Sequence, residues 1–203
     1  GILSIEESDT RSRLYGFALD IGTTKLAGYL VDLRTGRIAA VRSAVNPQVS
    51  YGEDVVRRIS YASASPDNLI KLHKEIVQSA NELIELACRQ VGISSSDVYD
   101  MAIVGNTVML QLFLRISPKY VALSPYIAAL GHSTSVKGDD LGIMINKGGY
   151  IYCVPCIAGF VGADAVADVL ATEMYKSEDT CMTVDIGTNT EIVIGNRSEM
   201  LAC

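Results

Sequence analysis

A short phrase occurs twice in this chain of 203 residues, and it constrains the fold more than any other feature. Residues 19–24 read Leu-Asp-Ile-Gly-Thr-Thr, and residues 184–189 read Val-Asp-Ile-Gly-Thr-Asn. Each copy ends one apolar strand and precedes another, so each predicts a β-hairpin with a tight turn. Backbone N–H groups in such a turn form a nest for an anion such as phosphate. We therefore expect two hairpins that face each other across a polyphosphate.

The two turns supply candidate ligands for a magnesium–polyphosphate group. Mg²⁺ usually keeps several waters and is held by one or two carboxylates together with phosphate oxygens. Asp20 and Asp185 are therefore the predicted magnesium contacts, reached through water. The predicted phosphate contacts are the small residues of the turns: Gly22, Thr23, Thr24, Gly187, Thr188 and Asn189.

Four other polar residues lie near these turns. Three of them have both a functional and a structural interpretation, and the fourth has a structural one. Lys25 adds a positive charge beside the first turn, or points into solvent. Asn106 ends a central strand, where α/β proteins bind ligands, or caps the next helix. Asp164 orients the attacking water, or stands in a first helical turn because an acid suits the helix dipole there. Glu191 is expected to pack or pair near the second hairpin. The predicted catalytic residues are Asp20, Asp164 and Asp185, and the predicted nucleotide contacts include Lys25 and Asn106.

Charge and hydropathy exclude several classes of partner. The formal net charge is −6 and the sequence pI is about 4.9, so nothing draws the chain to nucleic acid or to an anionic membrane. No apolar run reaches the ~18 residues that a membrane span requires. Residues 1–13 are polar and lack the apolar centre of a signal peptide. We expect a soluble, cytoplasmic protein in which residues 1–15 are a linker remnant.

Five cysteines with scattered spacing make a poor disulfide framework and suit a reducing compartment. Cys153 and Cys156 form one Cys-x-x-Cys pair with no second pair to accompany it. A metal or redox role is open for this pair, but two buried, small apolar side chains are the favoured interpretation.

Hydrophobic periodicity predicts alternating strands and helices. The predicted strands are 17–21, 26–33, 37–44, 101–104, 150–154, 181–186 and 200–202, and the predicted helices are 51–64, 66–91, 108–114 and 162–175. Residues 117–149 are expected to be irregular because they hold two prolines and five glycines. The acids near residue 53 and the pair Arg57-Arg58 are interpreted as a solvated helix face, with contact to a partner as the alternative.

This order of elements resembles the first lobe of the actin-like fold shared by sugar kinases, heat-shock chaperone ATPases and actin. The resemblance implies an α/β fold in which each lobe opens with a hairpin and the two hairpins hold the nucleotide phosphates. It divides the chain into a first lobe at 16–180 and the opening hairpin of a truncated second lobe at 181–203.

A narrower resemblance rests on several phrases in combination. They are Leu-Asp-Ile-Gly-Thr-Thr at 19–24, Asn-Pro-Gln at 46–48, Tyr-Gly-Glu-Asp-Val at 51–55, Val-Gly-Asn-Thr-Val-Met at 104–109, Ile-Ala-Gly-Phe-Val-Gly-Ala-Asp at 157–164 and Asp-Ile-Gly-Thr-Asn-Thr-Glu-Ile at 185–192. Together they resemble the reductive activators of corrinoid proteins over roughly residues 16–203. Members of that family join a ferredoxin-like iron–sulfur domain to an actin-like ATPase region.

The resemblance implies ATP-dependent reduction of a corrinoid protein from Co(II) to Co(I) in a methyl-transfer system. ATP and Mg²⁺ are the implied cofactors of this region, and a 2Fe–2S cluster is expected only in a ferredoxin domain outside this chain. The implied partners are the corrinoid protein and an electron donor, and a homodimer is allowed. We expect a fragment of such a protein, inactive alone.

Other functions stay open on the same residues. A small-molecule kinase of the same fold would transfer phosphate to a hydroxyl or carboxylate, but no substrate-binding cluster is identified. An activator of a radical dehydratase would need cluster-ligating cysteines within this lobe. A nucleotide-switched scaffold protein would polymerise without turnover.

Overall fold

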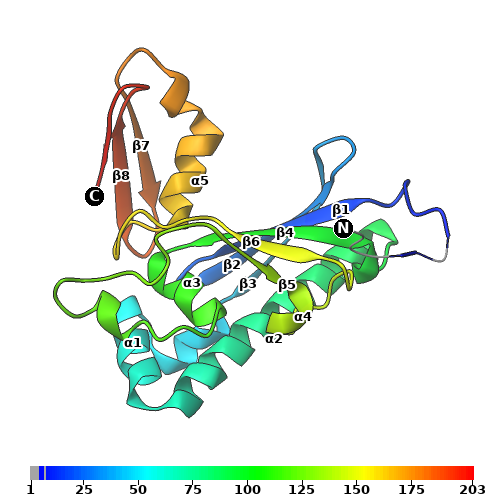
Figure 1. Ribbon diagram of the computed structural model, residues 1–203, viewed down its shortest axis with the longest axis horizontal. Coiled ribbons are helices and arrows are strands. Elements are labelled where there is room, and N and C mark those ends of the chain that lie inside the picture. Colours follow the sequence, from blue (N-terminus) through cyan, green and yellow to red (C-terminus); the bar gives the residue numbers. More distant parts are fainter. Residues whose placement is uncertain (1–4, 7) are drawn as a thin grey trace.

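The computed structural model describes residues 5, 6 and 8–203, and within them the chain forms two β-sheets with helices (Figure 1). The larger sheet has the strand order β3-β2-β1-β4-β6-β5, and the smaller has the order β7-β8-β9. The strands are β1 Tyr15–Ile21, β2 Lys25–Asp32, β3 Arg37–Val45, β4 Val98–Gly105, β5 Thr134–Lys137, β6 Tyr150–Cys153, β7 Cys181–Ile186, β8 Thr190–Gly195 and β9 Met200–Ala202. The α-helices are α1 Val55–Ala64, α2 Pro66–Val91, α3 Thr107–Phe113, α4 Gly138–Leu141 and α5 Ala163–Thr172.

Strand β1 gives its two faces different environments. Phe17, Leu19 and Ile21 are buried in the main core, as the period of two in a strand predicts. Ala18 and Asp20 alternate with them and therefore lie on the opposite face of the sheet. Asp20 thus faces away from the main core.

The parallel strands β1 and β4 end side by side. Ile21 pairs with Gly105 in their register, so the residues that follow both strands meet at one edge of the sheet. The carboxyl edge of parallel strands is where α/β proteins bind ligands. This register brings the first predicted turn next to Asn106.

Helix α2 closes one face of the larger sheet. The Ser65 side chain caps its N-terminus, Pro66 occupies the first turn, and Gly92 ends it in the left-handed conformation at φ 76°. Its apolar stripe, which includes Leu72, Ile76 and Ile84, is fully buried in the main core. Helices α1 to α4 all lie on this side of the sheet, and α5 with the smaller sheet rises from the other side (Figure 1).

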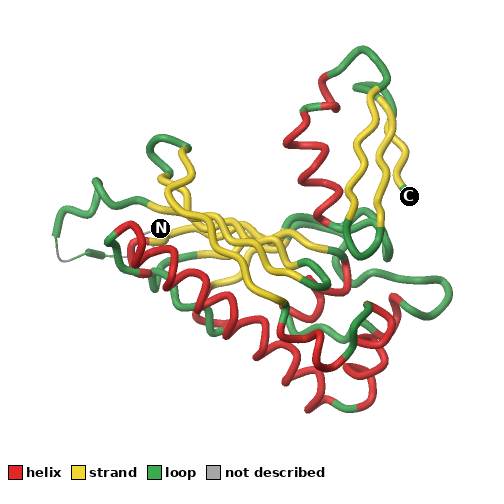
Figure 2. Tube along the Cα trace, turned by 180° about the vertical axis from the view of Figure 1, so that it is seen from behind, coloured by secondary structure: helices red, strands yellow, loops and turns green. Residues whose placement is uncertain are grey.

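Helix α5 belongs to a second, smaller core. Val161, Ala165, Met174 and Val193 are buried together, with Val169 and Cys181 packed against them. Helix and smaller sheet therefore stand together at one end of the larger sheet (Figure 2). The predicted lobe boundary at residue 180 stays a prediction, although the apolar face of α5 packs on the smaller sheet that follows it.

Several predicted elements differ from the structure. The strand predicted at 101–104 is longer and spans Val98–Gly105. The helix predicted at 51–64 begins at Val55, because the Asp54 side chain caps it and a 3₁₀ turn occupies Pro47–Tyr51. The helix predicted to reach Tyr175 ends at Thr172, where Glu173 adopts φ 53°. Residues 117–149 are not irregular throughout: they include the edge strand β5, which pairs antiparallel with β6, and the short helix α4. A four-residue edge strand has too little apolar pattern to be recognised from sequence.

No helix within the described part of the chain is long and apolar enough to cross a membrane.

Candidate functional site

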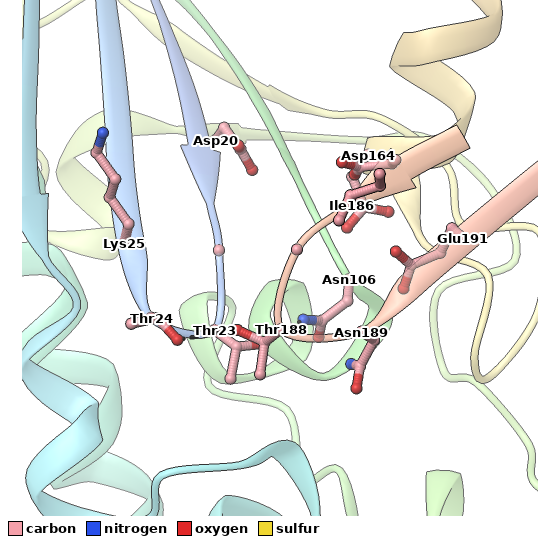
Figure 3. A pocket seen from close by; sticks show the side chains of 13 residues that line it. Asp20, Thr23, Thr24, Lys25, Asn106, Asp164, Ile186, Thr188, Asn189 and Glu191 are labelled. Atoms are coloured by element: carbon pink, nitrogen blue, oxygen red, sulfur yellow. Dashed lines mark hydrogen bonds between the residues drawn. The ribbon is translucent and has the colours of Figure 1, made fainter. Parts of the chain in front are cut away.

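A cavity of about 400 Å³ lies where the two sheets meet, between the two hairpin turns (Figure 3). Its lining includes all eleven residues that the sequence predicts as site residues: Asp20, Gly22, Thr23, Thr24, Lys25, Asn106, Asp164, Asp185, Gly187, Thr188 and Asn189. Ile186 and Glu191 complete the lining. The structure brings the predicted residues together, and their individual roles stay predictions.

The first turn is tight, and backbone hydrogen bonds hold both of its ends. The backbone N–H of Gly22 donates to the carbonyl of Lys25 at 3.0 Å, and a Cβ at position 22 would lie 2.6 Å from that oxygen. Glycine is therefore required here by close approach of the backbone. The carbonyl of Thr24 accepts from the backbone N–H of Asn46 at 2.8 Å, which fixes the end of the turn.

The second turn repeats this construction and touches the first. The N–H of Gly187 donates to the carbonyl of Asn189 at 2.9 Å. The hydroxyls of Thr24 and Thr188 lie 2.9 Å apart and share a hydrogen bond. Figure 3 shows the two turns converging below the carboxylates. Two backbone turns with hydroxyls and N–H groups on one cavity suit a phosphate chain.

Asn106 caps the next helix and also lines the cavity, so its role toward a ligand stays a prediction. Its Oδ1 accepts from the N–H of Met109 at 3.0 Å and so caps α3. Its Nδ2 donates to the Thr23 hydroxyl at 3.1 Å at the edge of the cavity. Gly162 allows the start of α5 to come close, because a Cβ there would lie 2.5 Å from the Asn106 Cα.

Asp164 stands in the first turn of α5 and also lines the cavity, and its role in orienting water stays a prediction. Its Oδ1 accepts from the N–H of Ala165 at 2.9 Å. Burial raises the pKa of Asp164, and the charge of Asp185 adds to the rise. Figure 3 shows Asp20 and Asp164 turned toward the same space.

Asp20 has the most perturbed carboxyl of the cavity. Burial, together with the negative charges of Asp164, Asp185 and Asp168, raises its pKa to about 6. A carboxyl with this pKa exchanges a proton near neutral pH. Several negative charges therefore converge on one half of the cavity.

Two acids of this group were not predicted as site residues. Glu191 lines the cavity and lies directly opposite Asp185 in the β7–β8 register, within the second hairpin near which it was expected to pack or pair. Asp168 follows Asp164 by four residues on α5, and burial together with the charges of Asp185 and Asp164 raises its pKa. The i, i+4 spacing of a helix would have placed Asp168 beside Asp164.

Lys25 is the basic side chain among the described lining residues, and it is exposed. Figure 3 shows its side chain running along β2, away from the carboxylates. The acids are therefore not neutralised by lysine, and like charges such as Asp185 and Glu191 opposite each other destabilise a hairpin. A bound cation would relieve that repulsion.

The donor set fits a hydrated Mg²⁺ rather than a metal caged by protein. Within the described residues no group of three or more His, Cys, Asp or Glu side chains is placed to hold a metal ion. Mg²⁺ held by phosphate oxygens, waters and one or two carboxylates needs no such group. Asp20 and Asp185 have the carboxylate chemistry for that arrangement.

Cys153 and Cys156 are buried, as the favoured interpretation of this pair predicts. Burial raises the pKa of Cys153 to about 12 and raises that of Cys156 as well. The raised pKa keeps both thiols protonated at neutral pH, as expected of buried, small apolar side chains.

Arg58 contradicts the prediction of a solvated helix face. Its side chain is fully buried, whereas the neighbouring Arg57 is exposed and faces Glu53 and Asp54. The Nη2 of Arg58 donates to the carbonyl of Thr23, within the first turn. A single sequence gives no sign of this, because Arg on a helix is exposed in most proteins.

Three comparisons with known proteins agree with one another. The family model described as the RACo middle region matches residues 15–177. The corrinoid activation enzyme RamQ of Eubacterium limosum is 35% identical over 192 residues, which are 95% of this chain and 32% of that protein. The [Co(II) methylated amine-specific corrinoid protein] reductase of Methanosarcina barkeri is 26% identical over 196 residues, covering 91% of this chain and 35% of that protein.

A solved structure confirms the predicted actin-like α/β fold class. The reductive activator for corrinoid, iron–sulfur protein superposes with a TM-score of 0.95 at 36% identity, over 99% of this chain and 32% of that one. The chain thus spans about a third of the length of the relatives it matches. Since the family model covers most of the chain, this protein belongs to the RACo middle region family.

Proposed function

We propose that this chain is the phosphate-binding part of an ATP-dependent enzyme that reduces a corrinoid protein from Co(II) to Co(I). The observation that carries the proposal is the 2.9 Å contact between Thr24 and Thr188, which brings two separate hairpin turns onto one cavity. The corrinoid substrate is inferred from the activities for which the relatives are named, RamQ and the corrinoid protein reductase.

Different residues of the cavity have different proposed roles, according to their chemistry. The turns at 22–24 and 187–189 bind the polyphosphate through N–H groups and hydroxyls. Asp20 and Asp185 would hold the waters of a nucleotide-bound Mg²⁺ ion, which would offset the charge of the phosphates. Asp164 lies on the α5 side of the cavity and orients the water that attacks the terminal phosphate.

In this proposal the residues of the cavity take no part in electron transfer. A 2Fe–2S cluster in a ferredoxin domain would supply the single electron that reduces Co(II) to Co(I). Reduction of Co(II) is uphill for ordinary donors, so ATP must favour the protein state in which the reduced cobalt is stabilised. A cytoplasmic location and a homodimer belong to the same proposal.

An anaerobic assay on the natural full-length protein tests this function. Co(II) corrinoid protein, a reductant and Mg-ATP are mixed, and the Co(I) absorption spectrum is followed with and without nucleotide. We expect Co(I) only with Mg-ATP, together with iron and sulfide in about equal amounts in the protein. Nucleotide-independent reduction, or phosphate transfer to a small hydroxyl compound in place of reduction, would overturn the proposal.

A further inference from the structure

We infer that Arg58 and Asn46 are positioning residues that hold the first hairpin turn with two consecutive backbone N–H groups directed into the cavity. The inference rests on the proposed function, because the group to be bound is the nucleotide phosphate. It goes beyond that function by assigning a role to two buried residues that do not line the cavity.

Two successive carbonyls of the turn are hydrogen-bonded from the core side. The Nδ2 of Asn46 donates to the carbonyl of Gly22 at 2.8 Å, and the Nη2 of Arg58 donates to the carbonyl of Thr23. Both side chains are fully buried, so they lie beneath the turn. The cavity lies on the other side of the turn, where Gly22, Thr23 and Thr24 line it.

Peptide geometry converts these carbonyl contacts into a direction for the N–H groups. In a planar trans peptide the C=O and the following N–H point in opposite directions. The carbonyls of Gly22 and Thr23 point toward the core, to Asn46 and Arg58. The N–H groups of Thr23 and Thr24 therefore point away from the core, into the cavity. Neither N–H donates a hydrogen bond to another described residue of the chain.

Arg58 is held in place by a second set of contacts. Its Nε donates to the carbonyl of Gly52 at 2.8 Å, and its Nη1 lies 3.2 Å from the Met109 sulfur. Asp54 caps the helix that carries Arg58, which fixes the base of the side chain. Gly52 and Asp54, from the segment 51–55, thus help to hold the Arg58 guanidinium beneath the turn.

The charge of Arg58 has no carboxylate in contact with it among the described residues, because its partners are carbonyl oxygens, a side-chain amide and sulfur. Burial lowers the pKa of Arg58 to about 10, so the group stays positive at neutral pH. A buried positive charge directly beneath a turn strengthens the attraction of that turn for an anion, since the interior screens charge weakly. The direction of the two N–H groups and the charge of Arg58 thus both favour an anionic ligand.

The test compares three variants of the natural full-length protein. Arg58→Lys keeps the positive charge but replaces the planar guanidinium. A single ammonium group would then have to donate to both carbonyls that the Nε and Nη2 of Arg58 contact. Asn46→Asp keeps the oxygen that caps the 3₁₀ turn at Gln48 but removes the donor to Gly22. Arg57→Met, which removes an exposed guanidinium one residue away, is the matched control.

Two readouts are measured at a temperature where every variant is folded by circular dichroism. The first is the Kd for Mg-ATP and for pyrophosphate. The second is hydrogen–deuterium exchange at the Thr23 and Thr24 amides, with and without Mg-ATP. We expect both amides to become protected by Mg-ATP in the unmodified protein. Arg58→Lys and Asn46→Asp should lose that protection and raise Kd by about tenfold or more, whereas Arg57→Met changes Kd by less than about twofold.

The outcomes separate the inference from the function. Unchanged Kd and amide protection in both Arg58→Lys and Asn46→Asp, with normal binding by the unmodified protein, overturns the inference and leaves the proposed function intact. Binding of Mg-ATP by the unmodified protein without protection of Thr23 and Thr24 also overturns it. Absence of binding by the unmodified protein overturns both. If one variant fails to fold, the other variant and the exchange of the unmodified protein decide the inference.

Discussion

The hydroxyls of Thr24 and Thr188 lie 2.9 Å apart although 164 positions separate them in the chain. One belongs to the hairpin that opens the larger sheet, and the other to the hairpin that opens the smaller sheet. A ligand between the turns contacts both sheets at once. Its binding free energy therefore stabilises the arrangement of the two sheets, by simple linkage.

Replacing either hydroxyl should weaken nucleotide binding. Thr24→Val and Thr188→Val each remove a donor from the cavity while keeping the branched shape of the side chain. We expect Kd for Mg-ATP to rise by about tenfold in each variant, measured by calorimetry. Thr35→Val, in the exposed turn between β2 and β3, is the control and should bind normally. Normal binding by both cavity variants would contradict a phosphate role for the two turns.

The raised pKa of Asp20 makes the free energy of unfolding depend on pH. Its pKa is raised from the ordinary 3.8 to about 6, so the folded state binds this proton more tightly than the unfolded state does. The stabilising contribution is fully present below pH 4, falls as pH rises through about 6, and is absent above that. In Asp20→Asn this decline should disappear, and the free energy of unfolding at pH 7 to 8 should rise by on the order of 1 kcal/mol.

Urea unfolding between pH 4 and pH 8 measures this change. Asp100→Asn is the matched control, because Asp100 is exposed on β4 in the same sheet and the substitution removes the same charge. Asp20→Asn should also weaken Mg-ATP binding while it stabilises the fold. A variant that loses stability at pH 7 would contradict the assignment of a raised pKa to this carboxyl.

Asp164 should affect hydrolysis more than binding. Asp164→Asn keeps the acceptor for the N–H of Ala165 at the start of α5 but removes the charge that faces the cavity. We expect kcat for ATP hydrolysis to fall by about a hundredfold with Kd for Mg-ATP changed by less than about threefold. Asp168→Asn, one helical turn further on, is the comparison, and a smaller loss is expected there because Asp168 does not line the cavity. Equal losses in both variants would favour a general effect of negative charge over a specific role for Asp164.

The cysteines should differ sharply in reactivity. Cys88, Cys153 and Cys156 are buried, and burial raises the pKa of each thiol, whereas Cys203 is exposed. Iodoacetamide labelling of the folded 203-residue chain, followed by mass spectrometry, should modify Cys203 first and the three buried thiols only after denaturant is added. Rapid labelling of Cys153 and Cys156 in the folded protein would reopen a redox role for the pair.

The sequence alone determined the parts of this protein that depend on local pattern. The repeated phrase at 19–24 and 184–189 predicted two hairpins, and both form because apolar strands flank a turn of small residues. Ser65, Pro66 and Gly92 predicted both ends of α2, because caps and breakers act on the residues next to them.

Tertiary structure decided the features that depend on residues far apart in the chain. The contact between the two turns needs the smaller sheet to stand over the end of the larger one. Through the packing of α5 on β7 and β8, Glu191 lines the cavity and Asp168 interacts electrostatically with Asp164 and Asp185. Arg58 lies beneath Thr23 because α1 packs against the main core, and burial in that core, rather than any local pattern, separates it from the exposed Arg57.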